Sequence, residues 1–170
     1  KTTRAEYQGG YDAGKAQLTF GAEREESSYR TEGFGSVETA EAWVNSGYAQ
    51  VTLSPARGLT LTGGVRYDDH KAFGGHTVFA GSMAYTPNGG DTVFRASFGE
   101  GFKAPSLFQL YSDYGNAALA PETSQSWDAG VTHSFLDGRA EVSATYFHRD
   151  SKNLIAYVGC FLNPAPICVG

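Results

Sequence analysis

The sequence predicts an all-β fold, an antiparallel up-and-down segment of a transmembrane β-barrel with about eight strands. Its 170 residues include 22 Gly and 10 Tyr against two Trp and one Met, a composition typical of short extended segments separated by turns. Polar and apolar residues alternate with a period of two along several segments, which indicates strands with one apolar face. The links between these segments alternate between short and long, as in outer-membrane barrels.

The expected strands follow from the alternation. In the clearest segment, 59–68, the odd positions read Leu-Leu-Gly-Val-Tyr and the even positions read Thr-Thr-Gly-Arg-Asp. The polar face is rich in Gly, Ser, Thr and Ala with scattered charges such as Glu23, Arg66 and Asp128, which favours a barrel lumen over a solubilising surface. In chain order the expected strands are a weaker one at 1–8, then 18–23, 49–54, 59–68, 76–85, 94–99, 126–135 and 141–146.

The expected links separate into two classes. Short links occur at 8–14, 54–58, 87–90 and 136–138, and long links at 27–41, 69–75, 103–123 and from about 158 to the end. A meander with these links places its tight turns at one rim and its long loops at the other.

Composition excludes several other classes of protein. No run of about 18 apolar residues is present, so no membrane-spanning helix is expected, and a barrel is the other way to cross a bilayer. The net charge is −5 and no Lys/Arg cluster could neutralise phosphates, so we expect no nucleic-acid partner.

No enzyme signature is present. The four histidines lack metal-ligand spacing, and no serine lies on a recognisable nucleophile turn. We therefore expect no catalytic residues, no metal site and no cofactor. Cys160 and Cys168 bracket a stretch with two prolines, which is typical of a loop. A disulfide between them is expected in an oxidising compartment, and two unpaired thiols are the alternative.

One long stretch resembles a known family. Residues 93–111 read VFRASFGEGFKAPSLFQLY, residues 114–116 read YGN and residues 119–130 read LAPETSQSWDAG. This ordered pattern resembles TonB-dependent receptors, and within them the cobalamin receptor group. Weaker resemblance covers 59–69 and 144–157. Ala117 stands where the family often has Pro, and Ala120 where it often has Lys or Asp.

The resemblance implies a role in import across the bacterial outer membrane. It implies a 22-stranded barrel closed by an N-terminal plug, which binds a large, scarce nutrient and releases it when TonB acts on the plug. Residues 1–170 would form part of that barrel, with the plug absent. Cobalamin is the favoured nutrient, with a ferric siderophore or haem as alternatives. The expected partners are outer-membrane lipid, TonB through the missing plug, and the nutrient.

The long link 103–123 is the expected place for ligand contacts. Adjacent aromatic, carboxylate and amide side chains there could stack on and hydrogen-bond to a bulky polar ligand, and the candidates are Tyr111, Asp113, Tyr114 and Asn116.

Two rival folds make distinct predictions. A small closed eight-stranded barrel with a structural or adhesion role requires its first and last strands to pair. A soluble β-sandwich binding module requires its apolar face to be buried between two sheets.

Overall fold

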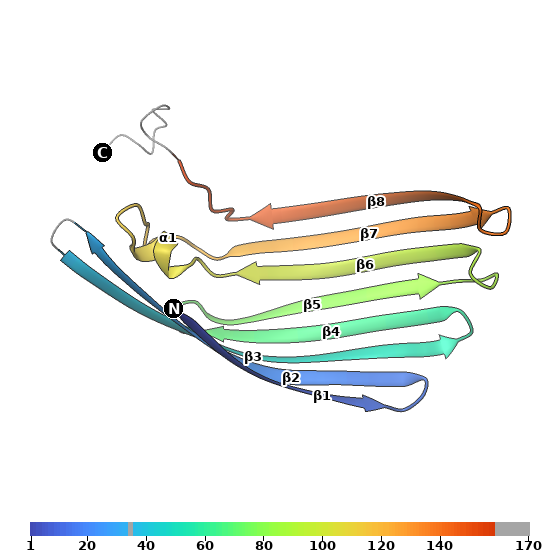
Figure 1. Cartoon of the computed structure of the whole chain (residues 1–170), viewed down its shortest axis with the longest axis horizontal. Helices are drawn as coiled ribbons and strands as arrows, with labels where there is room; N and C mark the ends of the chain where they lie inside the picture. Colours follow the sequence, from blue (N-terminus) through green and yellow to red (C-terminus); the bar gives the residue numbers. More distant parts are fainter. Residues whose placement is uncertain (34–35, 159–170) are drawn as a thin grey trace.

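The computed structural model describes residues 1–33 and 36–158, so the expected Cys160–Cys168 disulfide lies outside the described residues. The chain forms one curved sheet with a short helix at one end (Figure 1). No helix within the described ranges is long and apolar enough to span a membrane. The elements are β1 (Thr2–Asp12), β2 (Ala16–Gly33), β3 (Ser36–Ala56), β4 (Leu59–His70), β5 (Gly74–Tyr85), β6 (Thr92–Lys103), α1 (Leu107–Tyr111), β7 (Glu122–Phe135) and β8 (Ala140–Lys152).

The sheet has the up-and-down order predicted from the sequence. Its eight strands lie in the order β1 to β8, and each is antiparallel to its neighbours. In the part of the chain that the structure describes, β1 pairs with β2 and β8 pairs with β7, and the two do not pair with each other. The expectation of the closed eight-stranded rival therefore fails for these residues, and the observed sheet is a curved wall.

The β1–β2, β3–β4, β5–β6 and β7–β8 turns lie at the end of the sheet away from α1 (Figure 1). The β7–β8 turn uses positive φ values at Leu136 (54°), Asp137 (56°) and Gly138 (81°), which suit the right-handed twist of an antiparallel hairpin. Near the β3–β4 turn the register shifts between Leu53 and Ala56, where Pro55 has no N–H to donate.

Two of the predicted long links are wrong. Residues 27–41 are mostly strand, because β2 and β3 remain paired from Ala16↔Leu53 to Gly33↔Ser36. The link predicted at 69–75 is only the short turn between His70 and Gly74. Polar residues can continue a ladder without alternation, so the end of the apolar pattern did not mark the end of the strand. By contrast, 103–123 is a long link as predicted, and it carries α1.

Burial is inverted relative to a soluble domain. Leu110 is the one large apolar side chain classed as buried among the described residues, whereas Glu23, Ser46 and His70 are buried polar residues. The apolar face of the one sheet is exposed, which contradicts the sandwich rival. In β4 this face extends from Leu59 to Tyr67, and in β7 from Trp127 to Phe135. Exposed large residues on this face include Leu18, Phe20, Val51, Leu53, Val65, Tyr67, Phe79, Met83, Tyr85, Phe94, Phe98, Trp127, Val131, Phe135 and Tyr146.

Candidate functional site

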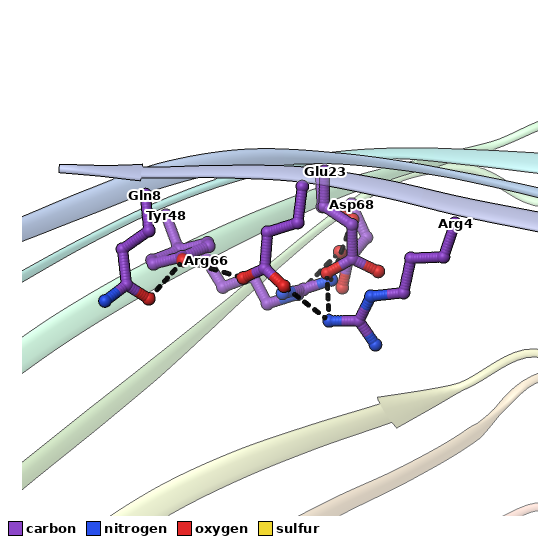
Figure 2. Close-up of polar contacts among 8 residues, drawn as sticks. Arg4, Gln8, Glu23, Tyr48, Arg66 and Asp68 are labelled. Atoms are coloured by element: carbon purple, nitrogen blue, oxygen red, sulfur yellow. Dashed lines mark hydrogen bonds and ion pairs between the residues drawn. The ribbon is translucent and has the colours of Figure 1, made fainter.

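A polar network lies on the face of β1–β4 opposite the exposed apolar side chains. The strand register places Glu6, Glu23, Ser46 and Asp68 in one row across the sheet. A neighbouring row contains Gln8, Gly21, Tyr48 and Arg66. Because residues two apart on a strand share a face, both rows point to the same side. Figure 2 shows the labelled side chains of this network projecting together from the sheet.

Glu23 is the buried centre of the network. Only 6% of its side-chain surface is exposed, and its Oε2 lies 2.8 Å from Arg4 Nη2 and 3.5 Å from Arg66 Nη2. Arg66 also donates from Nε to Asp68 Oδ1 at 2.8 Å and from Nη2 to Ser46 Oγ at 2.8 Å. A buried carboxylate needs such partners, since an unpaired charge away from water is costly. The guanidinium of Arg66 thus connects three strands.

Tyr48 extends the network across the sheet. Its hydroxyl donates to Glu6 Oε1 at 2.9 Å or to Gln8 Oε1 at 3.0 Å, and the Arg66 guanidinium carbon lies 6.0 Å from its ring centroid. Gly21 makes room for the ring, because a Cβ at Gly21 would overlap the Tyr48 ring and lie 2.6 Å from the Tyr7 carbonyl oxygen. Glycine is therefore required here by close approach.

The link between β6 and β7 folds back over this face. Its helix α1 begins with a capping box: Ser106 Oγ accepts from Gln109 N–H at 3.2 Å, and Gln109 Oε1 accepts from Ser106 N–H at 2.9 Å. The ring of Phe108 packs edge to face against the ring of Tyr29 in β2, with 6.2 Å between the ring centroids. The link that leaves β6 therefore reaches the long β2–β3 hairpin.

Two cavities lie between this link and the sheet. One of 390 Å³ is lined by residues of β2, β3 and the start of the link, including Tyr29, Trp43 and Leu107. A smaller one of 190 Å³ is lined by Glu23, Glu25, Asp68, Arg66, His70 and Phe102, among others. His70 is the last residue of β4, past the end of the row of apolar side chains that finishes at Tyr67. Burial lowers the pKa of its imidazole. The smaller cavity is thus lined mainly by charged and polar groups, and the larger one by aromatic and apolar groups as well.

The four predicted ligand-contact residues all lie in this link, but their side chains differ in solvent exposure and in the hydrogen bonds that they already make. Tyr111 and Tyr114 are 42% and 78% exposed, and Asp113 is exposed. The Asn116 side-chain oxygen already accepts from Ala118 N–H at 2.9 Å, so it holds a turn. None of the four makes a hydrogen bond or ion pair to the Glu23 network among the described residues.

Sequence reasoning placed Glu23 and Arg66 on the polar face but did not identify the network. The sequence does show Arg and Glu at polar-face positions of neighbouring strands. It does not show the register between those strands, which is needed to place these side chains beside one another. The described residues contain no cluster of His, Cys, Asp or Glu suited to a metal ion. The network offers hydrogen-bond donors and acceptors for binding.

Comparisons with known proteins agree with this architecture. Residues 2–165 match the family described as TonB dependent receptor-like, beta-barrel. The fold is similar to the ferric enterobactin receptor PfeA of Pseudomonas aeruginosa (23% identity, 89% of this chain, TM-score 0.74). It is also similar to the siderophore receptors PirA of Acinetobacter baumannii (19%, 89%, 0.74) and PirA of Pseudomonas aeruginosa (25%, 88%, 0.70). The chain spans 26%, 26% and 30% of those three chains, respectively.

Proposed function

The chain belongs to the TonB-dependent receptor β-barrel family, and we propose that it forms part of the wall of an outer-membrane receptor that imports a large, scarce nutrient. The observation that carries the proposal is the inverted sheet. Its apolar side chains are exposed on one face, and its buried charges lie on the other. A lipid-facing exterior and a polar lumen require this arrangement.

We propose that residues 1–170 supply only part of the barrel. The solved receptors similar in fold are three to four times longer than the matched part. A plug and the segment that TonB contacts would come from elsewhere in the full receptor. TonB is then a partner of the whole receptor through its plug, and lipid is the partner of this segment.

Cobalamin is the first substrate to test. The proposal rests on the resemblance of residues 93–130 to the cobalamin receptor group. A ferric siderophore is the second candidate, favoured by the fold similarity to siderophore receptors. In either case we propose that Tyr111, Asp113, Tyr114 and Asn116 contact the ligand from the rim and that the Glu23 network lines the lumen below them.

Equilibrium binding to the full-length receptor in detergent tests this proposal. Cyanocobalamin and ferric enterobactin are titrated separately into the unsubstituted receptor, the Tyr114→Ala variant and the Tyr11→Ala variant. Tyr11 is a matched control, because it is 68% exposed but lies beside the β1–β2 turn at the opposite rim.

Each outcome has a separate meaning. Cobalamin binding that is weakened by Tyr114→Ala and unchanged by Tyr11→Ala supports both the substrate and the site. Binding of ferric enterobactin alone retains the import role and replaces the substrate. Equal weakening by both variants would remove residues 111–116 from the proposed site, and binding of neither ligand would reject both candidates.

A further inference from the structure

The ladder between β5 and β6 is incomplete at the end of the sheet that carries α1 (Figure 1). These strands pair only from Ala80↔Gly99 to Tyr85↔Phe94, although β5 begins at Gly74 and β6 continues to Lys103. Their other edges stay paired throughout. β5 pairs with β4 as far as Gly74↔His70, and β6 pairs with β7 as far as Lys103↔Glu122. We call the unpaired interval between residues 74–79 and 100–103 the β5–β6 seam.

Side chains replace backbone pairing in the seam. The Phe79 N–H donates to the Glu100 carboxylate at 3.1 Å, where a ladder would present a backbone carbonyl. The His76 and Phe102 rings stack at 3.9 Å with 21° between their planes. These two contacts can break singly, because neither is part of a cooperative run of backbone hydrogen bonds.

A cavity of 480 Å³ lies along the seam. Its lining includes His76 and Val78 from β5 and Glu100 and Phe102 from β6, and it continues over the ends of β7 and β8. Space beside the seam means that its two sides can move apart without displacing a packed core.

The seam lies near the end of the apolar face, close to the rim of the proposed barrel. Tyr67, the last large residue on the apolar face of β4, pairs with Thr77 in the seam. The unpaired backbone groups therefore lie largely at the rim, where water can hydrate them. Unpaired groups within hydrocarbon would be costly.

The strands on either side of the seam remain continuous. At the same end, β6 is laddered to β7 and β7 to β8 as far as Thr123↔Lys152. These three strands thus form one arm, and the link 104–121 leaves from its first strand. Across the sheet the link rests on the other body, because α1 contacts both β2 and β3, with Phe108 against Tyr29.

We propose that the β5–β6 seam is a built-in opening line of the barrel wall. The β6–β8 arm, with the link 104–121, moves as a unit away from β1–β5 at this end. Opening breaks the Glu100 and His76–Phe102 contacts and releases α1, including Phe108, from β2 and β3. The ladder below Ala80 and Gly99 acts as the hinge. This inference goes beyond the proposed import role and does not depend on a ligand.

Hydrogen exchange in the full-length receptor in detergent, without ligand, tests the seam. The Phe79 amide points toward β6, so Thr77 and Gly75 should do the same, as should Gly81 and Met83 within the intact ladder. We expect the amides of Thr77 and Phe79 to exchange about 100-fold faster than those of Gly81 and Met83. This comparison lies within one strand of the unsubstituted chain, so it requires no variant to fold.

Two controls separate a specific seam from general fraying. The Ser124 amide lies at the same rim, points toward β6 as the Ser134 amide does, sits in the β6–β7 ladder opposite Gly101 and should remain protected. In the Glu100→Ala variant, exchange at Phe79 should accelerate about tenfold further, whereas Glu100→Gln keeps an acceptor and should change it less. Equal protection of the Thr77 and Phe79 amides and those of Gly81 and Met83 would overturn the proposal. Exchange at Ser124 as fast as at Thr77 and Phe79 would also overturn it.

Discussion

At the scale of single residues, the charge at Glu23 determines what the neighbouring strands can tolerate. The carboxylate is nearly buried and depends on guanidinium groups from β1 and β4. Removing one partner leaves a buried charge poorly compensated, which costs more than the pair contributes when intact.

We expect Arg66→Ala to lower the free energy of unfolding of the full-length receptor by about 1–3 kcal/mol. The reason is that Glu23 loses one partner and Asp68 loses its Arg66 hydrogen bond. Urea titration of folding in lipid vesicles measures the change. Arg30→Ala is the control, because the Arg30–Glu32 pair is 66% exposed on both sides and should contribute below about 0.5 kcal/mol.

Adding Glu23→Gln to Arg66→Ala should recover part of the loss, since a neutral amide needs no cation. An additive double variant, or an Arg66→Ala receptor as stable as the parent, would show that water in the lumen already compensates Glu23.

Gly21 is a second residue-scale test. We expect Gly21→Ala to destabilise the receptor by about 1–3 kcal/mol, because the new methyl group displaces Tyr48 and crowds the Tyr7 carbonyl. Gly47→Ala on the adjacent strand meets nothing within 4 Å and serves as the control. Thermal unfolding followed by circular dichroism compares them, and equal midpoints would argue against the Tyr48 position.

At the scale of elements, α1 is held by its cap and its packing. A five-residue helix has little stability alone, so the capping box and buried Leu110 must support it. Ser112 contrasts with Ser106, because its hydroxyl is buried without a hydrogen-bond partner among the described groups.

We expect Ser106→Ala to cost the link 104–121 about 1 kcal/mol of local stability, seen as faster amide exchange at 107–111 with little change in global unfolding. Ser112→Ala removes an unsatisfied hydroxyl and should be neutral or slightly stabilising. If both variants loosen α1 equally, the capping box is not what holds it.

The start of β7 provides a pH-dependent contact. Glu122 lies at the rim, five residues before Trp127, and accepts from Ile155 N–H at 2.9 Å. That hydrogen bond, followed by the Lys103 interactions, lowers the pKa of Glu122 below its ordinary 4.5. A lowered carboxyl pKa stabilises the folded contact above the unfolded pKa, and this contribution is lost as the pH falls through the lower, folded value.

We therefore expect residues 153–155 to detach from β7 as the pH falls below 4.5, measured by the intrinsic-rate-corrected exchange of the Ile155 amide. The Glu122→Gln variant should lose this pH dependence. A transition of unchanged size in Glu122→Gln would assign it to another group.

At the scale of the whole molecule, stability cannot come from a buried apolar core. The apolar face is exposed, and in the proposed outer-membrane barrel it would face the bilayer while the polar face lines the lumen. An added charge should therefore destabilise the fold strongly at a residue on the apolar face and much less at its neighbour on the polar face.

We expect Val51→Arg to cost about 2–4 kcal/mol of folding free energy in lipid, the range for a cation deep in the apolar band. Val51 is 38% exposed on that face, and Gln50→Arg on the opposite face of β3 should cost much less. Folding titrations in vesicles compare the two, and similar costs would contradict a lipid-facing assignment for the Val51 side.

Several features of the fold follow from the sequence by itself. Period-two alternation predicted the number of strands and their faces, because each side chain's face depends on position within its own strand. The succession of links predicted the up-and-down order. The Gly and Pro positions likewise indicated most turns, and the motif at 93–130 indicated the family.

Only the tertiary structure decided the extent of β2 and β3, the Glu23 network, the incomplete β5–β6 ladder and the placement of α1 against β2. Strand length beyond the apolar face depends on a partner's register, and Arg4, Glu23 and Arg66 come from three strands far apart in sequence. Such contacts are fixed by pairing between strands, and alternation within a strand carries no information about its partner's register.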